Sequence, residues 1–212
     1  LQGLVLGALA SGAIRVEGGR VTTGFFVGWT EPFAIACGVF ALGLFSFLAA
    51  VYLTVEAAAA PAVEEDFRGR AIVAELLLAP MAAAVFFTAK RGAPEMFAGL
   101  TQWWAPWLVT ATSACALLAL GALVLRRYRV ARVAAIGQVA LILIGWSVAQ
   151  FPRLIVPDVD IFAAAAPEIT LKLLLGALAA GALILLPSLW YLFRVFKGER
   201  EIGRPVDTEE EH

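Results

Sequence analysis

Long apolar runs separated by short polar segments dominate this sequence. A helix needs about 20 apolar residues to cross the roughly 30 Å hydrocarbon core of a bilayer. Several runs reach about that length, and we predict complete membrane-spanning helices at residues 32–56, 69–89, 105–125, 132–150 and 167–196. The pattern therefore predicts an all-α integral membrane protein, a polytopic transmembrane helix bundle in which residues 1–212 form a single membrane-embedded unit.

The chain opens on a further apolar run at residues 1–14, which is too short to cross a bilayer. This run has no basic residues at its start and no small-residue cleavage pattern, so it is not typical of a signal peptide. We expect it to be the end of a helix that begins upstream. The chain would then be a fragment with five complete spans plus the end of one more.

Aromatic residues mark the ends of the predicted spans. Tryptophan favours the membrane–water interface because its ring is apolar and its N–H is polar. We expect five residues to be interfacial anchors: Trp29, Trp103, Trp104, Trp107 and Trp190. The last span would be about 45 Å long as a helix, so it must tilt, kink at Pro187 or project beyond the hydrocarbon.

Lysine and arginine residues divide unequally between the two sides of the predicted bundle. One side carries six: Arg15, Arg20, Lys90, Arg91, Arg153 and Lys172. The other carries ten: Arg68, Arg70, Arg126, Arg127, Arg129, Arg132, Arg194, Lys197, Arg200 and Arg204. Because cytoplasmic loops are enriched in these residues, we expect the second side and the tail at 197–212 to be cytoplasmic.

The composition excludes several functional classes. With 61% hydrophobic residues and a mean hydropathy of +0.86, the chain is far more apolar than a soluble domain. A net charge of −1 leaves no basic excess for binding a nucleic acid. Cys37 and Cys115 stand in separate apolar runs without metal-ligand spacing, so we interpret both as packing residues.

The chain is poor in haem ligands. Its one histidine, His212, is the last residue, and its two methionines are Met81 and Met96. Haem in a membrane helix needs an axial ligand, usually histidine or methionine. A lone methionine in an apolar helix is usually a packing residue. We therefore expect no catalytic, cofactor-binding or metal-binding residue in this chain.

Glu75 is the acidic residue that we expect below the membrane surface. One hypothesis makes it a buried polar or proton-path group, because ionisable residues inside membranes are costly and often functional. The other places it near enough to the cytoplasmic end to reach the headgroups or to pair with Arg70 or Arg126. The sequence favours the second hypothesis and leaves the first open.

Two blocks of the sequence resemble one family of membrane proteins. The first comprises GWSVAQFPRLIVPD, AAAPEITL and LLPSLWYLFRVFKG, and the second runs from Gly28 to Ala71 and ends in EEDFRGRA. These residues resemble subunit II of the cytochrome bd-type quinol oxidases, most of all its cyanide-insensitive branch. The resemblance covers nearly the whole chain. Asp66, Arg68 and Arg70 match a DFRxR-like segment of the family, and the match implies that they fix the cytoplasmic loop by capping and ion pairing.

The resemblance implies a multi-pass subunit of a quinol:oxygen oxidoreductase in a bacterial inner membrane, serving aerobic respiration. Two b-type haems and one d-type haem would belong to a partner, the haem-bearing subunit I, where quinol is oxidised and oxygen is reduced to water. This chain would pack against that subunit and help to wall the proton and oxygen routes. The resemblance leaves open a structural quinone in this chain, a small third subunit, the quinone type and the cyanide response.

Two other functions stay open on the sequence alone. A transporter or permease fragment would show intramembrane ionisable groups and broken helices, and Glu75, Pro80 and Pro187 are the residues of that kind here. A structural anchor subunit of another respiratory complex would have the same composition. Only the two motif blocks separate an oxidase subunit from these alternatives.

Overall fold

A computed structural model describes residues 1–198 and divides the chain into two units, 1–164 and 165–212. Within the described residues, five helices are long and apolar enough to cross a membrane: α2 (Pro32–Glu56), α3 (Pro61–Gly92), α5 (Ala105–Val124), α6 (Tyr128–Gln150) and α7 (Glu168–Gly198). These helices confirm the predicted class, an all-α polytopic membrane protein. That the chain forms a single membrane-embedded unit stays a prediction, and His212 and the rest of the expected tail from residue 199 lie outside the described residues.

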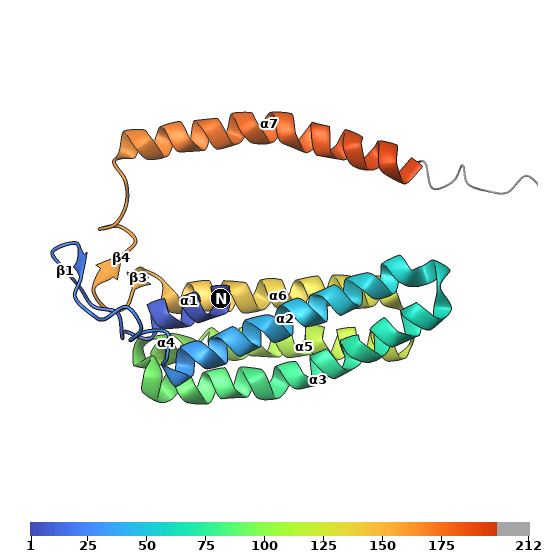
Figure 1. The fold of residues 1–212 in the computed structure, drawn as a ribbon, viewed down its shortest axis with the longest axis horizontal. Helices are drawn as coiled ribbons and strands as arrows, with labels where there is room; N and C mark the ends of the chain where they lie inside the picture. Colours follow the sequence, from blue (N-terminus) through green and yellow to red (C-terminus); the bar gives the residue numbers. More distant parts are fainter. Residues whose placement is uncertain (199–212) are drawn as a thin grey trace, which may run out of the picture. The chain divides into compact units, whose positions relative to one another are not determined.

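The first unit is a bundle of antiparallel helix pairs, shown lengthwise in Figure 1. A short 3₁₀ turn, η1 (Ala57–Ala59), connects α2 to α3, which pack along each other, and α5 and α6 form the second pair. Contacts of α2 with α6 and of α3 with α5 join the two pairs. The short helices α1 (Gln2–Ala10) and α4 (Pro94–Leu100) pack on α2 and α6, respectively.

The two ends of this bundle differ in composition. We call the end where α2 and α5 finish the arginine end, because Arg126, Arg127 and Arg129 lie at the turn between α5 and α6. The opposite end is the tryptophan end, with Trp103 and Trp104 before α5. Figure 1 shows two small hairpins at the tryptophan end: β1 (Val16–Glu17) with β2 (Arg20–Val21), and β3 (Arg153–Ile155) with β4 (Val159–Asp160).

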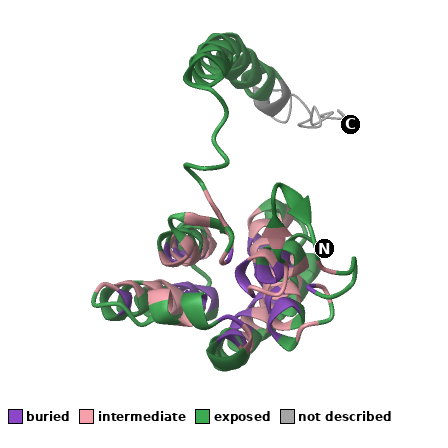
Figure 2. Ribbon diagram, turned by 90° about the vertical axis from the view of Figure 1, so that its left-hand side faces the viewer, coloured by how far each residue is buried: buried purple, intermediate pink, exposed green. Residues whose placement is uncertain are grey.

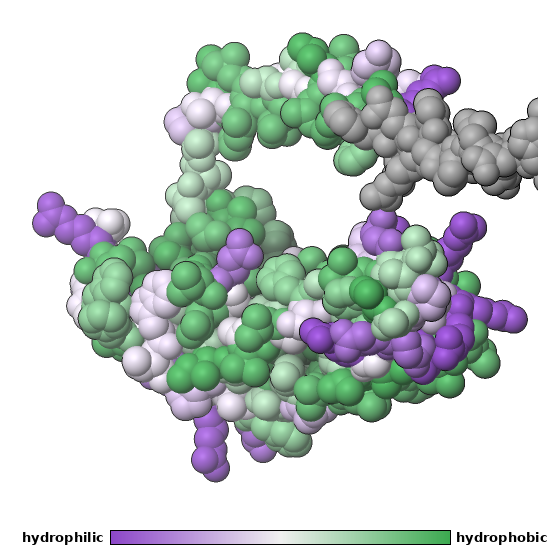
Figure 3. Space-filling view, turned by 45° about the vertical axis from the view of Figure 1, so that its right-hand side comes forward, coloured by the Kyte–Doolittle hydropathy of each residue, from purple (hydrophilic) through white to green (hydrophobic). Residues whose placement is uncertain are grey.

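The core of the first unit lies where the long helices face one another (Figure 2). Phe47, Val51 and Leu123 are fully buried in a cluster shared by α2, α3, α5 and α6. A second cluster contains Phe33 and Met96, and the ring of Trp146 stacks on Phe33 with centroids 6.1 Å apart. The flanks of the bundle expose mainly apolar side chains (Figure 3), as the lipid-facing surface of a membrane protein does.

Two glycines let α1 approach α2 closely. A Cβ atom at Gly7 would lie 2.6 Å from the Cα of Ala34, and one at Gly3 would lie 2.5 Å from the Cβ of Ala41. Residues three or four apart share a helix face, so Gly3 and Gly7 form one small-residue stripe of the kind that permits close helix packing in membranes. The sequence carried this signal in its first seven residues, and we did not predict the contact.

Helix α3 begins about two turns earlier than the sequence predicted. The predicted start was residue 69, with residues 57–70 as a loop, whereas α3 starts at Pro61. Proline is favourable at the first helical position, where its missing N–H is not needed. Acidic Glu64 lies in the first turn, where it interacts favourably with the helix dipole. We underestimated these start signals because the segment is charged rather than apolar.

Other boundaries also differ from the prediction. Helix α1 ends at Ala10 rather than at residue 14, because Gly12 has a φ of +74° and the Ser11 hydroxyl donates to the Ala8 carbonyl over 2.8 Å. Helix α6 begins at Tyr128 rather than at residue 132, after a turn in which Arg126 has a φ of +57°. We expected only loops where α4 and the two hairpins lie, since such short elements leave no long apolar run.

Helix α7 forms the described part of the second unit. It runs from Glu168 to Gly198, slightly past the predicted 167–196, and includes Pro187. Near its start, Lys172 pairs with Glu168 at 2.7 Å, and further along the Arg194 guanidinium lies 5.4 Å from the centre of the Trp190 ring. The helix is about 46 Å long, so it exceeds a hydrocarbon core of about 30 Å.

Candidate functional site

A buried hydrogen bond joins two helices in the interior of the first unit. The side-chain amide Nε2 of Gln138 on α6 donates to Oε1 of Glu75 on α3 over 2.9 Å. Glu75 is 6% exposed and Gln138 is 4% exposed. Because α3 packs mainly on α2 and α6 mainly on α5, this bond connects the two helix pairs of the bundle.

Apolar residues surround this pair along both helices. One turn away on α3 lie Ala71 and Leu78, and one turn before Gln138 on α6 lies Ala134; all three are buried in the core cluster. Within residues 1–198, the second oxygen of Glu75 (Oε2) and the oxygen of Gln138 (Oε1) have no hydrogen-bond partner. An unsatisfied buried polar atom costs about 1–3 kcal/mol, so two in one pair are a feature that needs a physical explanation.

The pair lies well inside the arginine end. Glu75 is five residues beyond Arg70 on α3, and Gln138 is six residues beyond Arg132 on α6. At 1.5 Å per residue, both side chains start about 8–9 Å deeper than these arginines. The Arg132 guanidinium itself lies over the Tyr52 ring of α2, 4.1 Å from its centre.

The favoured pairing of Glu75 with Arg70 or Arg126 is wrong. Arg70 pairs with Asp66 at 2.9 Å, and Arg126 pairs with Glu65 at 3.0 Å. Both arginines lie near the surface, where acidic residues at the start of α3 are within closer reach than Glu75. The alternative role of Glu75, a proton-path group, stays a prediction that these contacts do not test.

Asp66, Arg68 and Arg70 lie in the first turns of α3 rather than in a loop. Arg68 donates to and pairs with Glu65 three residues before it, and Arg70 pairs with Asp66 four residues before it. These spacings place opposite charges on one helix face, where they stabilise a helix. The residues therefore support the early start of α3, and Glu65 links that start to the α5–α6 turn through Arg126.

The expected tryptophan anchors lie near helix ends. Trp103 precedes α5, Trp107 is in its first turn, and both are largely exposed, while Trp104 is half-buried. Trp29 comes before α2, half-buried, with its ring stacked on Phe25. Trp190 lies on α7, eight residues before the last residue of that helix. Their role as membrane anchors stays a prediction.

Asp158 organises the tryptophan end, a role that we did not predict. Its Oδ2 atom accepts a hydrogen bond from the Val16 backbone N–H over 2.8 Å and lies 3.3 Å from Nε of Arg15. The backbone N–H of Val156 donates to the Leu9 carbonyl over 3.1 Å. Together these bonds join the segment after α6 to the end of α1 and the segment that follows it, more than 140 residues away in the sequence.

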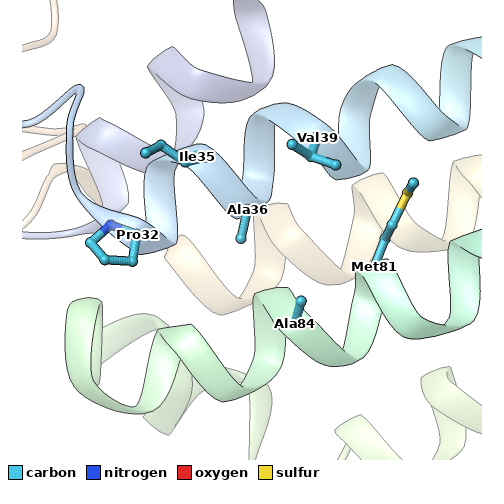
Figure 4. Close-up of a pocket in the computed structure, with 6 residues that line it drawn as sticks. All are labelled: Pro32, Ile35, Ala36, Val39, Met81 and Ala84. Carbon is cyan, nitrogen blue, oxygen red and sulfur yellow. The ribbon is translucent and has the colours of Figure 1, made fainter.

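An apolar groove opens between α2 and α3 (Figure 4). Its volume is about 410 Å³, and it is lined by Pro32, Ile35, Ala36, Val39, Met81 and Ala84. The Met81 sulfur also lies close to α2, because a Cβ atom at Gly43 would be only 2.8 Å from it. The groove offers apolar contact but no polar group that could orient a ligand.

The candidate axial haem ligands in the described residues are the two methionines. No group of three or more His, Cys, Asp or Glu side chains that could hold a metal occurs in this part of the chain. Met81 lines the apolar groove, and Met96 is buried beside Phe33 in the second core cluster.

Sequence reasoning singled out Glu75 but missed Gln138. The signal was available, because Gln138 stands alone as a polar residue within a long apolar stretch of the predicted span 132–150. Burying a neutral amide in a membrane costs far less free energy than burying a charge, so we did not single out Gln138 as a candidate. Its partner could not be deduced, because the two residues are 63 positions apart.

The chain resembles known oxidase proteins in sequence and fold. The sequence profile of the family described as cytochrome bd terminal oxidase subunit II matches residues 1–196. Among solved structures, the bd oxidase from Geobacillus thermodenitrificans is similar, with a TM-score of 0.74 and 23% sequence identity. The match covers 92% of this chain and 59% of that chain, so this chain spans about three fifths of its length. No curated protein sequence matches.

Proposed function

Since the chain belongs to the family of cytochrome bd terminal oxidase subunit II, we propose that it is the haem-free membrane subunit of a bd-type quinol:oxygen oxidoreductase. The family match over residues 1–196 carries this proposal. A fold shared with a bd oxidase over 92% of the chain supports it. The proposed complex thus serves aerobic respiration: it oxidises quinol and reduces oxygen to water.

The proposed division of labour assigns the redox chemistry to a partner. Haem needs axial ligands, usually histidine or methionine, and the sequence offers Met81, Met96 and His212. We therefore assign the two b-type haems, the d-type haem and the oxidation of quinol to a haem-bearing subunit I. The apolar flanks of the bundle suit packing against another membrane protein as well as against lipid. In that position the chain would support the partner and help to wall its proton and oxygen routes.

The proposed location is a bacterial inner membrane, with the arginine end and the C-terminus on the cytoplasmic side. Arg126 and Arg127 occupy the short connection between α5 and α6, and Arg129 follows in the first turn of α6. Positive charge in a short loop is the strongest signal for a cytoplasmic position. Pairing of Arg126 with Glu65 leaves Arg127 and Arg129 exposed at this end.

Within this proposal, Glu75 is the candidate proton-path group of the chain. It is the most deeply buried carboxylate in the described part of the chain, 6% exposed in the interior of the bundle. Ionisable groups in such positions are costly and often take part in proton transfer. Its place inside the arginine end would put it on the side from which the oxidase takes up protons.

The test is to express the natural full-length protein with its neighbouring subunit and to purify the complex through a tag on this chain. The expected result is co-purification of b- and d-type haem absorption in a reduced-minus-oxidised spectrum, with quinol-dependent oxygen uptake. A stoichiometric complex without haem would contradict the proposal and favour a transporter or an anchor subunit. Haem retained by this chain after removal of its partner would contradict the division of labour.

A further inference from the structure

Three buried side-chain oxygen atoms in the described residues lack a hydrogen-bond partner, and two of them belong to the same hydrogen-bonded pair; the third is the Tyr128 hydroxyl at the start of α6. Gln138 Nε2 already donates to Glu75 Oε1, which leaves Glu75 Oε2 and Gln138 Oε1 without a partner within the described residues. If Glu75 is ionised, both remaining atoms are acceptors, and two acceptors cannot bond to each other. An ionised pair would therefore leave one charged and one neutral oxygen unsatisfied in an apolar core.

One proton added to Glu75 gives both of these oxygen atoms a hydrogen-bond partner. A protonated carboxyl group has an O–H donor, and the amide oxygen of Gln138 is the acceptor that is left over. A carboxylic acid and a primary amide can then form a closed ring with two parallel hydrogen bonds, N–H to carbonyl oxygen and O–H to amide oxygen. This arrangement leaves the pair neutral and gives a partner to both of its unpartnered oxygen atoms.

The surroundings supply no positive charge that would favour ionised Glu75. Arg70 on α3 pairs with Asp66, Arg126 before α6 pairs with Glu65, and Arg132 on α6 lies over the Tyr52 ring of α2. On α5, residues 105–124 include no acidic or basic side chain, and Cys115 is their only titratable group. No ion pair in the described part of the chain involves Glu75, and burying an unpaired charge in an apolar interior is strongly unfavourable.

We propose that Glu75 and Gln138 form a proton-binding site, in which Glu75 holds a proton and its O–H donates a hydrogen bond to the Gln138 oxygen in a closed acid–amide pair. The proton is thereby held about 8 Å inside the arginine end, at the contact between the two helix pairs. Release of the proton breaks one of the two bonds between α3 and α6 and leaves a charge in the core. Proton binding is thus coupled to the hydrogen bonding that joins α3 to α6 across the two helix pairs. This inference does not depend on the proposed oxidase function.

Infrared spectroscopy of the purified full-length complex tests the site. Glu75→Gln replaces the acid by an amide that keeps both hydrogen bonds to Gln138. The wild-type-minus-variant spectrum should show loss of a carbonyl band of a protonated carboxyl group, and that band should shift in D₂O. Loss of carboxylate bands instead would overturn the proposal. Glu95→Gln is the matched control, because Glu95 is exposed and pairs with Arg153, so this substitution should remove carboxylate bands.

A second variant keeps the test decisive if Glu75→Gln does not assemble. Gln138→Leu removes the amide but leaves the acid in the apolar core. The protonated-carboxyl band of Glu75 should remain and move to higher frequency, because its carbonyl no longer accepts a hydrogen bond. An unchanged band position in Gln138→Leu, or absence of the band from the wild type, would overturn the closed pair.

Discussion

Arg126 joins the turn between α5 and α6 to the first turns of α3, because its guanidinium lies 3.0 Å from the Glu65 carboxylate. It is also the non-glycine residue with a positive φ, +57°, in the described part of the chain. A side chain at positive φ costs about 1–2 kcal/mol, so a contact with α3 is obtained at a strained backbone position.

Replacing Arg126 separates the backbone effect from the ion pair. Both Arg126→Ala and Arg126→Gly lose the pair with Glu65, but only glycine adopts a positive φ without strain. We expect Arg126→Gly to be more stable than Arg126→Ala by about 0.5–1 kcal/mol, measured by thermal unfolding of the purified complex. Arg129 in the first turn of α6 is the control: there alanine should be the more stable substitution. If alanine is the more stable substitution at both positions, or glycine at both, the backbone at Arg126 is not strained.

The Glu75–Gln138 bond should behave as a coupled pair. Glu75→Leu leaves the Gln138 amide unsatisfied, and Gln138→Leu leaves the acid unsatisfied, so each should lower the free energy of unfolding by about 1–3 kcal/mol. The double variant replaces both partners by apolar groups and should be more stable than either single variant. A double-mutant cycle on thermal unfolding measures this coupling. Additive losses would show that the two side chains act independently.

Oxygen uptake tests the proton-path role of Glu75. If protons pass through Glu75, Glu75→Gln should slow quinol-dependent oxygen uptake by about tenfold or more, which corresponds to about 1.4 kcal/mol in activation free energy. Haem content and thermal stability should stay at the wild-type level, because the amide keeps both hydrogen bonds. The uptake should also become more sensitive to D₂O. If Glu75→Gln takes up oxygen at the wild-type rate, Glu75 binds a proton without passing protons to the reaction. Glu95→Gln is the control for the loss of a carboxylate elsewhere in the chain.

Close packing of α1 on α2 should depend on Gly7. A Cβ atom there would lie 2.6 Å from the Cα of Ala34, which belongs to the α2 backbone and cannot move aside alone. We expect Gly7→Ala to lower the free energy of unfolding by about 1–3 kcal/mol, as overpacking does. Gly121 on α5 has no described atom within 4 Å of such a Cβ, so Gly121→Ala should be neutral or slightly stabilising. Equal losses at both glycines would refute the close approach.

The sequence by itself determined the class of the protein, the number of spans and most of their bounds. Backbone N–H and C=O groups must be satisfied inside a bilayer, so each apolar run of about 20 residues has to be a helix. This constraint is local, and it placed α2 at residues 32–56 without any knowledge of its neighbours. It also marked Glu75, because a carboxylate inside an apolar run is visible along the chain.

Only the tertiary structure decided which side chains meet. The spanning helices are apolar on nearly all sides, so no stripe of hydrophobic residues marks the face that turns inward. The contacts of Glu75 with Gln138 and of Gly7 with Ala34 depend on how far each helix is shifted along its axis and rotated about it. That alignment is set by close packing between segments distant in the sequence, and it gave Glu75 a neutral amide as its partner instead of the arginines at the bundle end.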